Sequence, residues 1–377
     1  MAPLTKAQKK QAQAAEDSFN RTYAAQYGEE RWQQTLYPAL VAPTRYAMLI
    51  NRYATTSDIP EAFTQDEAQG LQPITFPSPP LSSNPEKPEP PTTTTPAEAV
   101  SSSLLAYQSD SPTPFPPPHP HPSTRLLTHW NLDAASLLAA TLLAPRPGNK
   151  VLDLCAAPGG KSLALSQLLR PTTPSSPPLG GGCLHSNEPH PARNQRLSSN
   201  LASYLPASLF SPGAIKVLRL DASAPTAATQ LPLGPGAYDK VLLDAPCSSE
   251  RHVVHARATG SWRSGSSRQA AKTQLALLAT ALRALRVGGQ VLYATCSLSG
   301  DENDGVVARG LEWVAKERRK TRLAGKAWGV AVRSADLAPL LQAWAEPTAH
   351  GWLVLPDHPA GGRWGPLYFA LLEKVAV

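Results

Sequence analysis

The chain has 377 residues, of which 42% are hydrophobic, so it is long enough to bury a sizeable core in one large domain or two. Its net charge of +7 favours a polyanionic partner such as nucleic acid without requiring one. It contains no run of about 20 apolar residues and no cysteine pair with zinc-ligand spacing, so we expect no membrane span, no metal and free thiols.

The first expected region, residues 1–72, is helical from residue 5 onward. Four aromatic side chains fall on one side of an amphipathic helix that breaks near Gly28: Phe19, Tyr23, Tyr27 and Trp32. The segment 44–53 continues this pattern. The basic residues before Glu16 fit a mitochondrial leader only loosely, so mitochondrion, nucleus and cytoplasm stay open as compartments.

The second expected region, residues 73–122, carries much of the chain's proline, together with serine and threonine. Such a composition cannot build a packed core, which favours a disordered insertion or linker. A PxxP ligand for a partner domain is the alternative.

The third expected region, residues 123–377, alternates apolar strands with helices, which is typical of an α/β fold with a mostly parallel, doubly wound sheet. The expected strands are 150–155, 183–188, 215–221, 239–246, 289–297, 351–357 and 366–375. The clearest helices are 131–144, 162–169 and 273–289, the last ending at its glycines. The low-complexity stretches 171–182 and 206–214 fit surface loops.

Acidic residues stand at the ends of four successive strands: Asp153, Glu188, Asp221 and Asp244. Ligands of doubly wound sheets bind beyond the carboxyl ends of the strands, where Glu188 suits ribose hydroxyls and Asp221 an adenine amino group. The first strand continues into a glycine turn, "VLDLCAAPGGKS", which matches neither GxGxxG nor a phosphate loop. We therefore expect an adenosine-type cofactor, although any single strand-end acid is more often a cap or turn residue.

Two cysteines, Cys247 and Cys296, follow the strands 239–246 and 289–297 and are flanked by small or polar residues. If these strands are neighbours, both thiols face the reactive end of an S-adenosylmethionine (SAM) pocket; inert structural thiols are the alternative. A thiolate that adds to carbon 6 of cytosine lets carbon 5 accept a methyl group. Asp244 would hydrogen-bond the activated ring, and Lys161 would lower the thiol pKa.

The segments "DLCAAPGGKS", "DAPCSSERH" and "YATCSLSGDEN" closely resemble the NSUN (Nol/Nop/Sun-domain) RNA cytosine-5 methyltransferases, over roughly residues 126–377. The N-terminal segment and "ERHVVH" are similar to the mitochondrial branch, which methylates rRNA or tRNA. The resemblance implies a Rossmann-like, SAM-dependent domain with Cys296 as nucleophile, Cys247 releasing the product, and Asp244 and Lys161 facing an extruded base. It implies these cofactor contacts: Cys155, Ala156, Ala157, Pro158, Gly159, Gly160, Lys161, Glu188, Arg193, Asp221 and Asp244.

The expected function is therefore SAM-dependent cytosine-C5 methylation of structured RNA, either rRNA or tRNA. Since no PUA-type module is recognisable, target selection is left to the basic surface, the N-terminal helices or a protein partner. DNA methylation is a rival that the second cysteine disfavours. A non-catalytic RNA-binding or ribosome-assembly factor that keeps the fold is the rival from another class.

Overall fold

The computed structural model describes residues 5–54, 70–75, 104–109, 115–171, 176–211, 213–263, 265–322, 327–360 and 363–377. Within these residues, nine strands form a central sheet in the order β11-β12-β13-β9-β8-β5-β6-β7, with β10 paired to β13. The pairs from β9 to β7 are parallel, whereas β13 runs antiparallel to β9. The strand bounds are β5 Lys150–Asp153, β6 Cys183–Asn187, β7 Ile215–Leu218, β8 Tyr238–Asp244, β9 Leu285–Thr295, β10 Trp328–Val332, β11 Glu346–Pro347, β12 Trp352–Val354 and β13 Leu367–Ala376.

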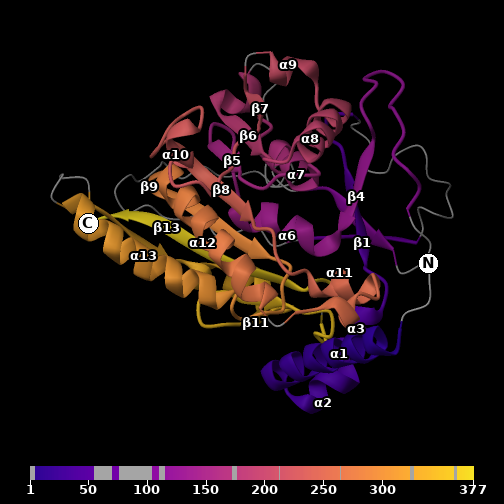
Figure 1. Cartoon of the computed structure of the whole chain (residues 1–377). Helices are drawn as coiled ribbons and strands as arrows, with labels where there is room; N and C mark the ends of the chain where they lie inside the picture. Colours follow the sequence, from indigo (N-terminus) through magenta and orange to yellow (C-terminus); the bar gives the residue numbers. More distant parts are fainter. Residues whose placement is uncertain are drawn as a thin grey trace.

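Helices cover both faces of this sheet (Figure 1), which confirms the α/β, Rossmann-like expectation. Because side chains alternate along a strand, Val151 and Leu242 contact the core under α6, α7 and α8, whereas Leu152 and Leu243 face α1, α12 and α13. The helix bounds are α1 Lys6–Tyr27, α6 Ala134–Leu143, α7 Gly160–Leu168, α8 Pro191–Tyr204, α9 Ala207–Phe210, α10 Ala227–Gln230, α11 Glu250–His255, α12 Ser266–Ala284, α13 Asp304–Arg322 and α14 Ala338–Leu341, with short 3-10 turns at Pro178–Gly181, Thr259–Ser261 and Ser334–Leu337.

Several expected boundaries differ from the structure. Residues 131–133, expected to begin a helix, end strand β4 (His129–Asp133), and α6 begins at Ala134. Helix α12 ends at Ala284 and β9 begins at the next residue, so the glycines expected to end this helix lie inside the strand. The expected loop 206–214 contains the short helix α9. These differences lie mainly at the ends of helices and strands, where pairing with neighbouring strands overrides local sequence preference.

The N-terminal helices pack on one end of the domain through aromatic side chains. Helix α1 is followed by α2 (Glu29–Arg31), a π-helical turn (Trp32–Leu36) and α3 (Tyr37–Val41). Phe19 lies edge-on to Tyr23, Trp32 and Trp262, at ring-centroid distances of 5.0, 5.9 and 5.6 Å. The predicted aromatic face therefore anchors α1 to the segment that follows α11.

The expected helix over residues 44–53 is wrong, because Tyr46–Ile50 form strand β1 of a second sheet. Its order is β2-β3-β1-β4, with β2 at Leu71–Pro73, β3 at Ala106–Ser109 and β4 at His129–Asp133. Ala47 and Leu49 join the main core, whereas Met48 and Ile50 contact Tyr107 on the opposite face. This two-residue alternation suits a strand that is buried on both sides.

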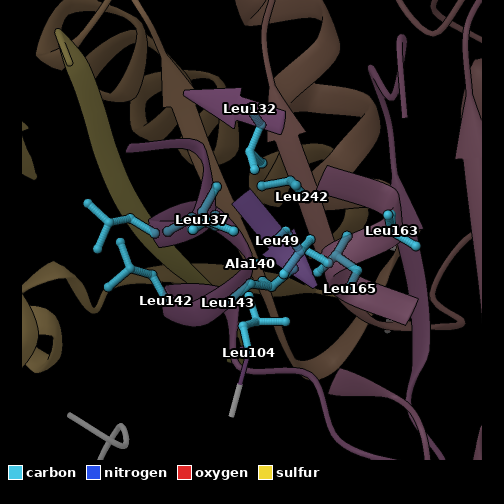
Figure 2. Close-up of a cluster of buried hydrophobic side chains, with 14 of the residues drawn as sticks. Leu49, Leu104, Leu132, Leu137, Ala140, Leu142, Leu143, Leu163, Leu165 and Leu242 are labelled. Carbon is cyan, nitrogen blue, oxygen red and sulfur yellow. The ribbon is translucent and has the colours of Figure 1, made fainter. Parts of the chain in front are cut away.

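Part of the proline-rich region 73–122 also belongs to the fold, contrary to the expectation of a disordered insertion. Strand β3 pairs with β1, and Leu104 and Ala106 are buried in the main core. Figure 2 shows Leu104 beside Leu49, Leu143 and Ala140, so this short apolar segment fills space under α6. Residues 76–103 and 110–114, with the possible PxxP ligand, lie outside the described residues.

A buried polar cluster links β5, α7 and β6. The Ser162 hydroxyl donates to Asp153 Oδ2 at 2.7 Å and lies 2.9 Å from the Ser186 hydroxyl. Burial, with the nearby charge of Asp244, raises the pKa of Asp153 to about 7.

None of the helices that the structure describes is long and apolar enough to cross a membrane.

The aromatic anchor predicts a large loss of stability for Phe19→Ala. Removing this fully buried ring leaves a cavity, so the free energy of unfolding should fall by about 3–5 kcal/mol in urea denaturation. Val41→Ala, at a position that is 52% exposed, is the control and should change it by less than about 0.5 kcal/mol. Equal effects of the two substitutions would contradict this packing.

Asp153→Asn should flatten the pH dependence of stability. Between an unfolded pKa of 3.8 and a folded pKa of about 7, the native wild type holds a proton that the unfolded chain has lost. Its free energy of unfolding therefore falls as pH rises through this window, whereas Asn cannot titrate. Urea denaturation at pH 5 and pH 8 measures both slopes, and identical slopes would show that Asp153 is not the group responsible.

Candidate active site

A cavity of about 470 Å³ lies where the parallel strands end. It is lined by Glu188 after β6, Asp221 after β7 and Asp244 at the end of β8. Cys247 and Cys296, which follow β8 and β9, line the same cavity. The structure thus brings together three of the four strand-end acids and both cysteines that the sequence singled out.

The register of β8 and β9 explains how the two thiols meet. These strands are parallel neighbours, as expected, and Asp244 stands opposite Ala294, with the Ala245 amide donating to the Ala294 carbonyl at 2.9 Å. Cys247 follows three residues after Asp244, and Cys296 two residues after Ala294. The chain therefore leaves both strands at the same level, and both cysteine loops turn into the same cavity.

The two sulfur atoms are in direct contact. Cys247 Sγ lies 2.8 Å from Cys296 Sγ, and the Ser249 hydroxyl lies 2.9 Å from Cys296 Sγ. The hydrogen bond from Cys247 and the one from Ser249 lower the pKa of Cys296 despite its burial. The same sulfur contact, together with burial, raises the pKa of Cys247. Cys296 is therefore the better thiolate of the pair, and Cys247 its hydrogen-bond donor.

Lys161 and Asp244 form an ion pair beside the thiols. Lys161 Nζ lies 2.7 Å from Asp244 Oδ2 and donates to the Ser136 hydroxyl at 3.1 Å. Burial acts to lower the pKa of Lys161, but the charge and hydrogen bond of Asp244 outweigh it and raise the pKa. Lys161 also interacts electrostatically with Cys296, yet the largest contributions that lower the thiol pKa come from Cys247 and Ser249.

A second cavity, of about 610 Å³, adjoins the first along a shared wall that includes Cys155, Ala157 and Asp244. Lys161 and Arg196 line it, as do Tyr204 and the partly exposed Trp130, whose rings are tilted by 56° with centroids 4.9 Å apart. Cationic and aromatic side chains are the groups that bind phosphates and unstacked bases. Trp130, Arg196 and Tyr204 were not identified from the sequence, because each stands in a helix or strand with no motif around it.

The first cavity suits the nucleoside part of SAM. Glu188, which is 3% exposed, is held by Arg193 at 3.2 Å, so its carboxylate is available to ribose hydroxyls at a fixed position. Hydrogen bonds from Ser223 lower the pKa of Asp221, which keeps it an ionised acceptor at the rim. The cavity volume also lies within the roughly 300–1,000 Å³ of small-molecule sites. The residues present therefore fit the cofactor.

The predicted cofactor contacts divide between the two cavities. The first is lined by Cys155, Ala157, Glu188, Arg193, Asp221 and Asp244, and the second by Cys155, Ala156, Ala157, Pro158, Gly160, Lys161 and Asp244. Gly159 lines neither of these two. A Cβ at Gly160 would stand 2.7 Å from Trp130 Nε1, so packing explains this glycine, whereas Gly159 is favoured by its φ of +120° as well as by a Cβ contact of 3.2 Å with Leu197.

Within the part of the chain that the structure describes, no group of three or more His, Cys, Asp or Glu side chains is arranged to hold a metal ion. The four cysteines, all inside described segments, are free thiols, as predicted.

Residues 140–339 match the family model of the 16S rRNA methyltransferases RsmB/F. The chain is 29% identical to the 5-cytosine rRNA methyltransferase NSUN4 of Mus musculus, over 95% of this chain and 88% of that protein. It is 34% identical to the mitochondrial tRNA (cytosine(34)-C(5))-methyltransferase of Danio rerio, over 66% of this chain and 62% of that protein.

Solved structures share the fold. PH0851 covers 94% of this chain, and the chain covers 65% of that structure, with a TM-score of 0.64 at 20% identity. NSun6 from Pyrococcus horikoshii, determined with SFG, has a TM-score of 0.60 at 18% identity, over 95% of this chain and 98% of that one. The chain belongs to the RsmB/F and NSUN family of SAM-dependent RNA cytosine-5 methyltransferases, in its mitochondrial-type branch.

Proposed function

We propose that this enzyme methylates carbon 5 of a cytosine in rRNA through a covalent adduct between Cys296 and the base. The contact that carries the proposal is the 2.8 Å separation of the Cys296 and Cys247 sulfurs, at the wall of a cavity that also holds Glu188 and Asp221. A nucleophile with a lowered pKa and a hydrogen-bond donor beside it is the arrangement that covalent addition and elimination need.

In the first half of the proposed reaction, the Cys296 thiolate adds to carbon 6 of cytosine, and the electron pair of the ring makes carbon 5 nucleophilic. SAM, when bound, supplies the electrophilic methyl group. Asp244 accepts a hydrogen bond from the exocyclic amine of the activated cytosine, and Lys161 holds this carboxylate in place through their 2.7 Å contact. The remaining predicted cofactor contacts, from Cys155 to Lys161 and at Glu188, Arg193 and Asp221, orient the donor.

In the second half, a base removes the proton from carbon 5, and the carbon–sulfur bond breaks with its electron pair returning to Cys296. Cys247 is in hydrogen-bond contact with that sulfur and retains its own proton because its pKa is raised. It therefore stabilises the departing thiolate. The same contact that makes Cys296 a nucleophile makes it a good leaving group.

The second cavity is the proposed entry for structured RNA, because it joins the first at Asp244 and carries Lys161, Arg196 and Trp130. NSUN4 of Mus musculus and of Bos taurus align over 95% of this chain, whereas NSUN4 of Xenopus laevis aligns over 66%, as the tRNA enzyme does; the two longer alignments support rRNA over tRNA as the substrate. The name of the tRNA enzyme supports a mitochondrial location. A protein partner that guides the enzyme to its RNA stays a prediction.

The two cysteines should fail in different ways. Cys296→Ala removes the nucleophile, so transfer of labelled methyl from SAM to RNA should be lost. Cys247→Ala removes the group that stabilises the leaving sulfur, so a covalent RNA–protein adduct should accumulate on denaturing gels. Cys183→Ala is the matched control: this thiol lies at the start of β6, away from the cavity-lining cysteines, and its loss should leave activity unchanged. An adduct that persists without Cys296 and requires Cys247 would reverse the two roles.

Deleting the gene should remove 5-methylcytosine from one rRNA position and leave tRNA unchanged. Bisulfite sequencing of separated rRNA and tRNA, from whole cells and purified mitochondria, measures both the substrate and the compartment. Restoring the deletion strain with the Cys183→Ala variant should restore the mark, and the Cys296→Ala variant should not. Loss of a tRNA mark with intact rRNA would contradict the rRNA assignment and leave the chemistry standing.

A further inference from the structure

Two glutamates that the mechanism does not use lie directly beneath the cysteine loops. Glu250 is in the first turn of α11, and Glu302 precedes α13; both side chains are 0% exposed. A carboxylate is costly to bury unless several donors satisfy it. The donors around these two glutamates come from the segments that carry the thiols.

Glu250 joins three parts of the chain. Its Oε1 accepts from the Tyr23 hydroxyl of α1 at 2.6 Å and from the Ser248 hydroxyl, and it lies 3.3 Å from the Ser297 hydroxyl. Its Oε2 accepts from the Leu298 amide at 2.8 Å. Glu250 therefore links the loop after β8, the loop after β9 and the N-terminal helix.

Glu302 makes a second link between the same two loops. Its Oε2 accepts from the Ser248 amide at 3.1 Å, and its Oε1 lies 2.5 Å from the Ser248 hydroxyl and 3.0 Å from the Ser297 hydroxyl, the two hydroxyls that it shares with Glu250. Gln274 of α12 donates to Glu302 Oε2 at 2.8 Å. The hydroxyls of Ser248 and Ser297 lie 3.0 Å apart. Ser248 and Ser297 are the residues that follow Cys247 and Cys296.

We propose that Glu250 and Glu302 are positioning residues that set the distance between the Cys247 and Cys296 sulfurs by holding the serine next to each cysteine. Neither glutamate has a place in the chemical steps. The inference rests on the proposed function for its purpose, since closely spaced thiols matter there to addition and release. The distance itself is a property of the folded chain and is measurable without RNA.

The N-terminal helix α1 also contacts the loop that carries Cys296. Besides the Tyr23 contact, Gln26 Nε2 and the Tyr27 hydroxyl each donate to the Leu298 carbonyl at 2.7 Å. Helix α1 approaches the segment after α11 so closely that a Cβ at Gly260 would stand 2.9 Å from the Ala12 Cβ. The helix thus braces the loop that carries Cys296 and has a structural role in the site apart from any contact with RNA.

Glu250→Gln keeps the shape of the side chain but replaces one acceptor oxygen with a donor. The carboxamide cannot accept from Tyr23, Ser248 and the Leu298 amide together, so the two loops lose part of their common support. The substitution leaves the cysteines and the cavity-lining acids in place. It therefore tests the positions of the two thiols and not their chemical roles.

Thiol–disulfide exchange with glutathione measures the separation of the sulfurs directly. Cys247 and Cys296 are oxidised to a disulfide while one oxidised glutathione is reduced to two thiols, so the equilibrium constant is the effective concentration of one sulfur at the other. Peptide mass spectrometry after acid quenching quantifies the disulfide. Glu250→Gln and Glu302→Gln should lower this effective concentration by about 10- to 100-fold, as expected for small misplacements of reacting groups.

Tyr23→Phe is the milder variant, and Tyr238→Phe is its matched control. Both remove a hydroxyl from a buried tyrosine, but Tyr238 bonds His185 at 2.6 Å at the opposite end of β8. The effective concentration should fall for Tyr23→Phe and stay at the wild-type value for Tyr238→Phe. SAM affinity, measured by calorimetry, should be unchanged in all four variants. Single-turnover adduct formation should slow in Glu250→Gln, Glu302→Gln and Tyr23→Phe, and stay at the wild-type rate in Tyr238→Phe.

An unchanged or raised effective concentration in folded Glu250→Gln and Tyr23→Phe would overturn the proposal, as would an equal loss in Tyr238→Phe. Because this equilibrium involves neither RNA nor methyl transfer, its outcome is independent of the proposed reaction. If wild type forms no RNA adduct but the variants still lose effective concentration, the proposed function fails and the positioning role stands.

Discussion

The parallel pairing of β8 with β9 is the constraint on which the site depends. Hydrogen bonds between these strands place Asp244 opposite Ala294, so the chain leaves both strands at one level. Two loops that are distant in sequence then bring Cys247 and Cys296 to 2.8 Å from each other. A shift of one residue in this register would turn every side chain of one strand to the other face and separate the thiols.

The elements around this pair hold it from both sides. On one face, the Lys161 and Asp244 ion pair is supported by Ser136 of α6. On the other, α1 and α11 meet at Glu250. The N-terminal helices, the parallel strands and the serine that follows each cysteine are therefore joined by one set of contacts around the thiols.

Much of this was predictable from the sequence, and the exceptions have physical causes. The parallel strands and the free thiols followed from apolar runs and short motifs, whereas the neighbouring positions of β8 and β9 were only a condition of the sequence argument, which the structure meets. The segment 46–50 was misread as helix, since four consecutive buried residues suit either period until a partner strand is known. Leu104 and Ala106 were hidden in a proline-rich context, because composition averages over a short apolar segment.

The contacts of the supporting side chains could not be predicted from local sequence. Glu250 and Glu302 read as ordinary polar loop residues, and Tyr23 as one member of an aromatic stripe; only the tertiary structure shows that they meet. The repeated Cys-Ser dipeptide was the available signal. It was interpreted only through the cysteines, although both serine hydroxyls contact Glu250 and Glu302.

The antiparallel position of β13 has a consequence for biosynthesis. Strand β9, which leads to Cys296, is flanked by β8 on one side and by Leu367–Ala376 on the other, and this second partner emerges from the ribosome only after α13 and the segments beyond it. Until then the nascent chain presents an apolar strand edge, which is prone to wrong pairing. Strand β9 and Cys296 emerge from the ribosome well before β13 does, so the folding yield should depend on how this strand edge is protected during translation.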